Sequence, residues 1–283
     1  MYKMLISAIA IILISFQSVA AGSTGILCIG ADIKSQEKDR IYKELNINAN
    51  AECVTLDHKE EKNYLPGVSS QSINSKASVC SYVVNNNSEG LRVYTKNIAY
   101  VTPEMIASSM ITAGIKDVDL KVISPYSISG STAVISIIKA YEKLEGSDIS
   151  KDVKIAAAEE LVFMGDLGQK IGMQKSLQFT NEIKKAVVKD KTADINAIKK
   201  IISNNEKRFN ISLDDMEKKS IISIMDRVRK SDLSENQIAA QQKNFSTYFN
   251  DFSETTVKTG FLRTIIHRLL YFLKEVSMYF TKK

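Results

Sequence analysis

The 283-residue chain has no tryptophan, two histidines, three cysteines and three prolines. No Cys-x-x-Cys pair and no His/Cys pair has the spacing of metal ligands, so we expect neither a metal site nor a cofactor. Neither histidine has a nucleophile beside it in a signature context, and the Gly-x-Ser-x-Gly turn of serine hydrolases is absent. The sequence therefore favours a non-enzymatic role.

An odd number of cysteines allows at most one disulfide. Cys28, Cys53 and Cys80 each lie in an apolar, strand-like segment. Two alternatives follow. All three can be buried thiols that act as small core residues, or Cys53 and Cys80 can form a bridge between neighbouring strands.

The N-terminus predicts export. Lys3 precedes an apolar run, Met4–Phe16, and Ser18-Val19-Ala20 matches a small-x-small cleavage site. We predict a signal peptide at 1–20, with Ala21 as the second choice for the cleavage site. An uncleaved anchor is the alternative, although the run is short for a membrane span. The mature chain is then expected to be secreted or extracytoplasmic, either free or peripheral on the outer face of the membrane.

Positive charge gathers in the second half of the chain. Residues 21–145 carry thirteen Lys+Arg against fourteen Asp+Glu, and residues 146–283 carry twenty-four against eighteen. Outside the cell, such an excess favours anionic lipid or wall polymer as the partner, and not nucleic acid.

The first half predicts an α/β domain over 21–146 with a mixed sheet in the order βαβββαβα. The expected strands are Gly25–Gly30, Glu52–Asp57, Ala77–Val84, Leu91–Val101 and Asp117–Ser124. We expect a charged loop at 58–62, a hairpin-type loop at 85–90, and a strand end at Ser124-Pro125. The helix after Thr102 has signals at both ends: Thr102 is the expected N-cap, and Gly114 is the left-handed residue of a Schellman-type C-terminal end.

The second half predicts only helices, over 147–250, which makes the fold class α+β. Ser150 caps a first helix to Phe163, and Gly165–Gly168 is a predicted break. Further helices are expected at Lys175–Val188, Ala193–Glu206, Leu213–Arg229 and Asn236–Phe249, the third capped by Ser212 with Asp215. Glu159 and Glu160 are adjacent and therefore diverge on their helix. One lysine-rich surface is either a solvated face or a contact for anionic wall polymer: Lys184, Lys185, Lys189, Lys191, Lys199 and Lys200.

The terminal segment, 256–283, predicts a basic amphipathic helix. Its charges are too frequent for a membrane-spanning helix. It either packs on the preceding helices or lies in a membrane interface. The candidate membrane contacts are Phe261, Arg263, Arg268, Phe272 and Lys274.

Several short motifs resemble one family of secreted Gram-positive proteins, the domain of unknown function 1002 or YpuA-like family. They are Gly30-Ala31-Asp32, Tyr64-Leu65-Pro66-Gly67, Asn97-Ile98, Val101–Met105, Thr112–Ile115, Ser124-Pro125, Ser129–Ala133, Glu159–Val162, Gly165–Gly168 and Phe209–Leu213. The resemblance extends to about Ser231 and leaves the terminal helix and the cysteines unmatched. It implies export and the fold, and it implies no activity, cofactor or catalytic residue.

Two groups of residues are candidate ligand contacts. Asp32, Asp57 and His58 follow predicted strands and converge if those strands are parallel, although both aspartates also suit helix or loop caps. Ser129, Gly130, Ser131 and Thr132 open a helix, where they either bind an anion or form an ordinary cap. We expect a non-catalytic binding or scaffolding protein of the cell envelope. The alternatives are an envelope hydrolase at the first group and a membrane-surface accessory protein.

Overall fold

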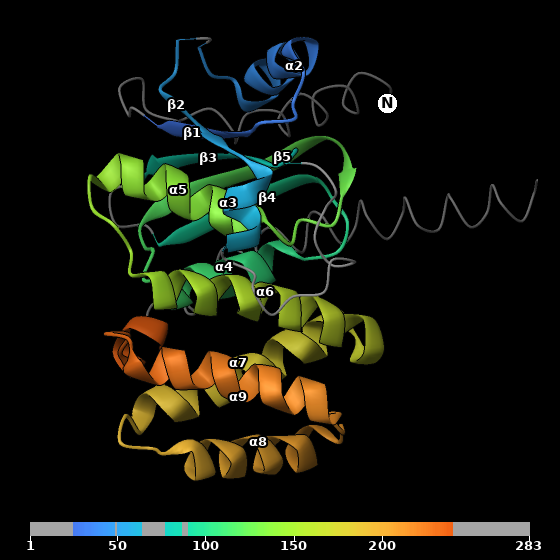
Figure 1. Cartoon of the computed structure of the whole chain (residues 1–283), viewed down its shortest axis with the longest axis vertical. Coiled ribbons are helices and arrows are strands. Elements are labelled where there is room, and N and C mark those ends of the chain that lie inside the picture. The colour runs from blue at the N-terminus through green and yellow to red at the C-terminus, as the bar shows by residue number, and fades with distance from the viewer. Residues whose placement is uncertain (1–24, 49, 64–76, 87–89, 240–283) are drawn as a thin grey trace, which may run out of the picture.

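A mixed sheet lies at one end of the molecule (Figure 1). The computed structural model describes residues 25–48, 50–63, 77–86 and 90–239. Within these residues, five strands are ordered β2-β1-β3-β5-β4. Neighbouring strands are parallel in β1–β2 and β4–β5 and antiparallel in β1–β3 and β3–β5. Their bounds are β1 Ile26–Gly30, β2 Cys53–Leu56, β3 Cys80–Asn85, β4 Leu91–Ile98 and β5 Val118–Ile128.

The predicted α+β class and mixed sheet are confirmed, but the predicted hairpin between β3 and β4 is wrong. β3 and β4 follow one another in sequence, yet β5 lies between them. β5 buries Val118, Leu120 and Val122, whereas β4 carries Arg92 and Lys96. The apolar strand therefore takes an inner position, and the charged strand forms the edge, where charge discourages pairing with other chains.

Helices cover both faces of the sheet. α2 (Ser35–Leu45) packs Ile41 and Leu45 against Leu27 and Ile29 on one face. α5 (Ala133–Glu145) and α4 (Pro103–Thr112) cover the other face. The segment predicted as a charged loop after β2 forms a short helix, α3 (His58–Asn63).

Both predicted ends of α4 are confirmed. Thr102 Oγ1 accepts a hydrogen bond from the Met105 N–H at 3.3 Å. Gly114 is left-handed (φ 76°), and the N–H groups of Gly114 and Ile115 bond to the carbonyls of Ile111 and Met110. This is the Schellman pattern, which satisfies the last carbonyls of the helix.

β5 does not end at Ser124-Pro125 as predicted but continues to Ile128. The register of β4 against β5 shifts between Lys96 and Ile98, and Asn97 adopts φ 61°. Asn97 Nδ2 donates to the Ser124 carbonyl at 2.7 Å. The irregularity in β4 thus accommodates Pro125 of β5, because a strand tolerates proline at sheet edges and at bulges.

Four long helices stack beneath α4 and α5 (Figure 1): α6 (Lys151–Ile171), α7 (Met173–Lys189), α8 (Ile195–Phe209) and α9 (Asp215–Lys230). α6 contacts α4 and α5 above and α7 and α9 below, and α8 is the outermost layer. One hydrophobic core extends from the sheet through α9. The predicted helices Lys175–Val188, Ala193–Glu206 and Leu213–Arg229 are confirmed as α7, α8 and α9, with ends that differ by a few residues. Most of the predicted helix Asn236–Phe249 lies outside the described residues, and the division into 21–146 and 147–250 stays a prediction.

The predicted break at Gly165–Gly168 is wrong, because α6 continues through it. A Cβ on Gly165 would lie 2.9 Å from Cδ1 of Tyr100, and a Cβ on Gly168 would lie 3.3 Å from the Met173 Cα. These glycines therefore allow close packing inside a helix and do not end it. The Tyr100 hydroxyl also donates to Asp166 on this turn.

α9 begins two residues later than predicted. Asp214, and not Ser212, is its N-cap, with a capping box in which Asp214 Oδ1 accepts from the Glu217 N–H at 2.9 Å and Glu217 Oε2 from the Asp214 N–H at 2.8 Å. Ser150 caps α6 as expected, accepting from the Val153 N–H.

The three cysteines are free, and only two of them are buried. Cys28 and Cys80 are fully buried, whereas Cys53 is exposed. β1 separates the strands of Cys53 and Cys80, so these residues are not on neighbouring strands. Burial raises the pKa of both Cys28 and Cys80 to about 12 and raises that of Cys53 by a smaller amount.

We therefore expect a single rapidly reacting thiol in the folded protein. At pH 8, a disulfide reagent such as Ellman's should modify Cys53 first, because thiolate is the reactive form and access is needed. Cys28 and Cys80 should react only after addition of denaturant. A Cys53→Ser variant should lose the fast phase. Two or three thiols reacting at one rate in native buffer would contradict the assignment.

Candidate functional site

The carboxyl ends of the parallel strands β1 and β2 bring the first predicted group to one edge of the sheet. Asp32 Oδ2 accepts from the Ala77 N–H at 2.8 Å. Asp57 and Glu60 exchange hydrogen bonds at the start of α3, each carboxylate accepting from the N–H of the other, at 2.8 and 3.1 Å. Both aspartates thus hold local backbone in place, in line with the capping alternative.

His58 has a buried carboxylate as its partner. Its Nδ1 lies 3.1 Å from Glu61 Oε2, and the Glu61 side chain is 0% exposed whereas that of His58 is 33% exposed. Burial raises the pKa of the Glu61 carboxyl, and the neighbouring His58 and Thr132 side chains oppose part of that rise. Glu61 is not singled out by the sequence, because it lies in a run of charged residues that is too short to show helical periodicity.

The Ser129–Thr132 segment meets the same carboxylate. Thr132 immediately precedes α5, and its side chain makes no capping hydrogen bond. Within the same segment, Ser129 Oγ accepts from the Ser131 N–H at 3.3 Å. Thr132 Oγ1 and Glu61 Oε1 are buried, and neither has a hydrogen-bond partner of regular geometry among the described residues. The predicted anion cradle therefore faces an acid of the protein itself, which suits the positive end of a helix dipole.

This cluster holds a histidine in a fixed orientation but offers it no nucleophile. A carboxylate on Nδ1 orients imidazole in acid–base enzymes. Here Thr132 lies beside the carboxylate, and no hydroxyl or thiol of the described residues bonds to His58 Nε2. Nor does the described part of the chain contain three or more His, Cys, Asp or Glu placed to hold a metal ion.

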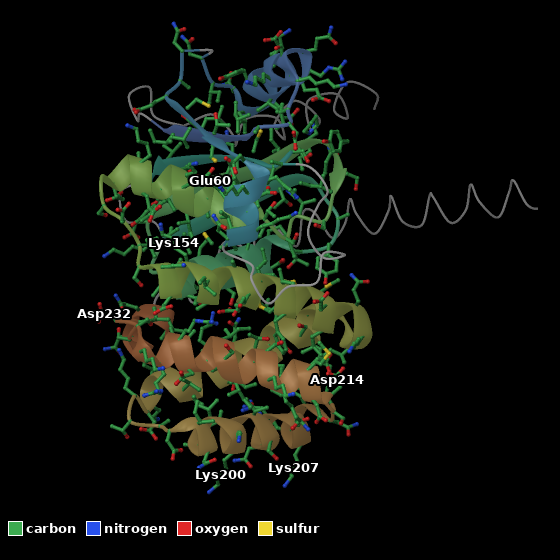
Figure 2. All side chains as sticks on the ribbon, viewed as in Figure 1. Glu60, Lys154, Lys200, Lys207, Asp214 and Asp232 are labelled. Carbon is green, nitrogen blue, oxygen red and sulfur yellow. The ribbon has the colours of Figure 1, made fainter. Side chains whose placement is uncertain are left out.

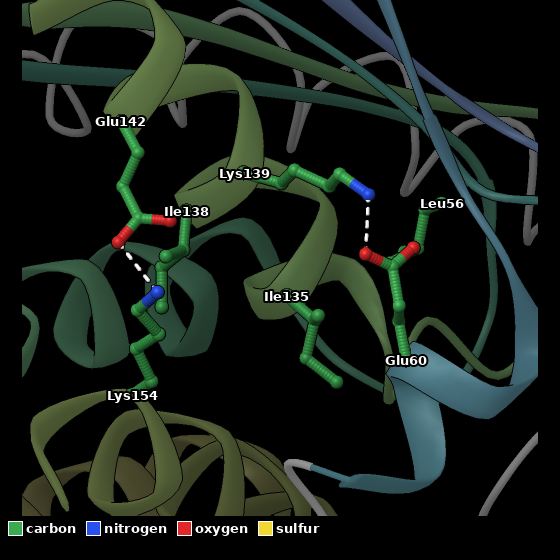
Figure 3. A pocket seen from close by; sticks show the side chains of 7 residues that line it. All are labelled: Leu56, Glu60, Ile135, Ile138, Lys139, Glu142 and Lys154. Carbon is green, nitrogen blue, oxygen red and sulfur yellow. Dashed lines mark hydrogen bonds and ion pairs between the residues drawn. The ribbon is translucent and has the colours of Figure 1, made fainter. Parts of the chain in front are cut away.

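A small cavity lies next to this cluster, between α3, α5 and α6 (Figure 3). Its volume is about 100 Å³. The buried side chains of Leu56, Ile135 and Ile138 form its apolar surface. Two ion pairs flank it: Lys139–Glu60 at 2.5 Å and Lys154–Glu142 at 2.6 Å.

A buried ion pair between α6 and α7 also bonds to α4, and the sequence-based prediction misplaced one of its members. Lys184 was expected on the lysine-rich surface, yet it is 0% exposed, as is Glu160. Lys184 Nζ lies 2.7 Å from Glu160 Oε1 and 2.9 Å from the hydroxyls of Ser108 and Thr112 on α4. Burial lowers the pKa of Lys184, and Glu160 opposes that shift.

Lys184 lies on the apolar face of α7. That position in the sequence pattern could have indicated that its side chain is buried. The face includes Leu177, Val187 and Val188, and these residues are buried. Glu159 diverges from Glu160, as expected, and pairs with Arg227 on α9 at 2.6 Å. Because all partners of Lys184 and Glu160 are internal, the pair acts in folding and does not form a surface site.

Of the other predicted lysines, Lys199 and Lys200 lie on α8, Lys185 and the exposed Lys189 lie on α7, and Lys191 follows α7. Lys199, Lys200 and Lys207 are exposed, and none of them forms an ion pair with another described residue. Lys200 and Lys207 extend away from the body of the protein in Figure 2. By contrast, Lys185 faces Glu182 at 3.8 Å, and Lys191 donates to the Ser231 carbonyl at 3.0 Å. Lys207 was not among the predicted residues.

Other predicted features lie outside the described residues: the signal peptide, the turn at Tyr64–Gly67, most of Asn236–Phe249, and the terminal helix with Phe261, Arg263, Arg268, Phe272 and Lys274. In the part of the chain that is described, none of the helices has the length and apolar character needed to cross a bilayer.

Comparison with known proteins identifies relatives but no activity. Residues 29–245 match the model of a family described as "Protein of unknown function (DUF1002)". A Bacillus subtilis (strain 168) protein, "Uncharacterized protein YpuA", is 32% identical over 268 residues, covering 93% of this chain and 92% of its own length. No solved structure matches significantly.

Proposed function

Because this chain belongs to the DUF1002 family of proteins of unknown function, we propose a function from its own surface: an exported, non-catalytic binding module of the cell envelope. Export is supported by Lys3, the apolar run Met4–Phe16 and the small-x-small sequence ending at Ala20. The partner we propose is an anionic wall polymer, bound by the outer face of α8.

The unpaired basic face of α8 carries this proposal. Lys199, Lys200 and Lys207 are free of described acidic partners, and their positions extend over about 12 Å of helix at 1.5 Å per residue. Charges that are spread along a helix suit a chain of repeated anionic groups better than a single small anion. Long-range attraction of this kind raises the local concentration of an oppositely charged partner.

The composition of this face favours a polymer over a lipid surface. Its other exposed residues include Asn196, Ser203 and Asn204. Ile195, 39% exposed in the first turn, is the one large exposed apolar side chain of α8. Helices that lie in a membrane interface insert a broad apolar face, and α8 uses its apolar face for packing.

Sedimentation with isolated bacterial cell walls tests the proposal. The full mature protein should sediment with intact walls and not with walls stripped of anionic polymer by acid. A Lys199→Gln/Lys200→Gln/Lys207→Gln variant should bind roughly tenfold more weakly, the summed effect of three exposed charge contacts.

The matched control removes the same net charge from the opposite end of the molecule. Arg40→Gln/Lys43→Gln/Lys59→Gln changes three exposed residues near the sheet and should bind like the wild type. Equal losses in both variants would attribute binding to overall charge, and equal binding to stripped walls would exclude the anionic polymer. Binding to anionic vesicles in preference to walls would support the membrane alternative.

A further inference from the structure

We propose that the cavity between α3, α5 and α6 binds a small zwitterion, with the chemistry of a free amino acid that has a short apolar side chain. This site is separate from the basic face of α8, and the inference does not depend on wall binding. It rests on the size of the cavity, on its apolar lining and on the arrangement of four charges around it.

Two lysines and two glutamates surround the cavity, so their charges cancel, and each ion pair joins α5 to a different helix. Lys139 and Glu142 both come from α5, whereas Glu60 comes from α3 and Lys154 from α6. In Figure 3 the two ion pairs lie on opposite sides of Ile135 and Ile138. A ligand with one charge would pair with one of these groups and repel or desolvate another, which selects against it. A ligand with an ammonium and a carboxylate can satisfy one glutamate and one lysine together.

The Lys139–Glu60 pair is the one that a ligand can open. Both side chains are about one third exposed, and exposed ion pairs contribute little to stability. Glu60 is held in place by its Oε2, which accepts from the Asp57 N–H. The Lys154–Glu142 pair is more buried, and Glu142 Oε1 also accepts from the Ile149 N–H at 2.6 Å. It therefore forms the fixed wall of the site.

This arrangement assigns a contact to each part of the ligand. The ammonium donates to Glu60 Oε1, the carboxylate accepts from Lys139 Nζ, and the apolar group lies against Leu56, Ile135 and Ile138. A volume of about 100 Å³ corresponds to roughly three water molecules. It limits the ligand to a few heavy atoms, because sites for larger molecules have about 300 Å³ or more.

Isothermal titration of the full mature protein with 2-aminobutyrate tests the site, with butyrate and propylamine as analogues that each lack one charge. We expect saturable binding of 2-aminobutyrate with a Kd of about 1 mM, as suits a ligand of this size. Each analogue should bind at least tenfold more weakly. Because this series uses the wild-type protein, it does not depend on the folding of any variant.

Two variants locate the site. Lys139→Met should weaken 2-aminobutyrate binding at least tenfold. Lys143→Met changes an exposed lysine of the same helix that pairs with Glu52, which is not among the residues lining the cavity, and should bind like the wild type. The proposal is overturned by no saturable binding at 20 mM, by butyrate or propylamine binding as tightly as the zwitterion, or by unchanged binding in a folded Lys139→Met protein.

Discussion

Replacing Lys184 by methionine should lower the free energy of unfolding by about 3–5 kcal/mol, since the change leaves the Glu160 carboxylate buried without its counter-charge. The two side chains are fully buried and 2.7 Å apart. Ser108 and Thr112 also bond to Glu160, at 3.0 and 2.5 Å, but hydroxyls cannot neutralise its charge. Urea denaturation followed by circular dichroism measures the loss.

The neighbouring residue supplies the control. Lys185→Met changes a side chain that is 42% exposed and 3.8 Å from Glu182, and it should alter stability by no more than about 0.5 kcal/mol. A Lys184→Met/Glu160→Gln double variant should recover part of the loss, because both charges are then removed. If Lys184→Met were as stable as Lys185→Met, the buried pair would have no role in joining the helical half to α4.

Replacing Gly30 by alanine should cost about 3 kcal/mol, the upper part of the range for overpacking. A Cβ at this position would lie 2.8 Å from the Ser78 N and still closer to the Ala77 carbonyl oxygen. These are backbone atoms, which cannot rotate away as a flexible side chain can. The same Ala77 carbonyl accepts from the Asp32 N–H at 3.0 Å, so the clash would also disturb the contact between β1 and the segment before β3.

Gly146 is the matched position for that substitution. It ends α5 in the left-handed conformation (φ 66°), and a Cβ there would meet open space. Gly146→Ala should therefore cost only about 1 kcal/mol, the backbone preference alone. Thermal and urea unfolding of both variants give the comparison. A loss at Gly30 no larger than the loss at Gly146 would show that the close backbone approach is not required.

The sequence predicted what local chemistry determines. Thr102 and Gly114 define α4 because capping depends on residues a few positions away. Long-range packing was not accessible in the same way. Nothing local indicates that β5 lies between β3 and β4, or that Gly165 leaves room for the Tyr100 ring inside a helix.

The candidate site was predictable only in outline. His58 and Thr132 were identified from strand ends and a helix start, and the structure brings both to Glu61, which was hidden in a charged run. Lys184 was assigned to the surface because a lysine is usually solvated, although its helical position is apolar. The cavity depends on three elements that converge from distant parts of the chain, so no single segment predicts it.

Several motifs that carry the family resemblance have structural roles here. Gly30 and Asp32 position the Ala77 backbone, Asn97 in the irregular part of β4 donates to the Ser124 carbonyl of β5, and Gly165 packs against Tyr100. These contacts explain how the motifs support the fold without indicating a reaction. The proposed function therefore depends on surface charge and not on those motifs.

The salt dependence of wall binding tests the central proposal most directly. The screening length falls from about 10 Å at 0.1 M salt to about 3 Å at 1 M, so contacts between exposed charges weaken strongly over this range. The wild-type protein should sediment with cell walls at 0.1 M NaCl and be released at 1 M, and the Lys199→Gln/Lys200→Gln/Lys207→Gln variant should bind weakly at both. Wild-type binding that persists at 1 M, or equal binding by the variant at 0.1 M, would contradict the proposed role of α8.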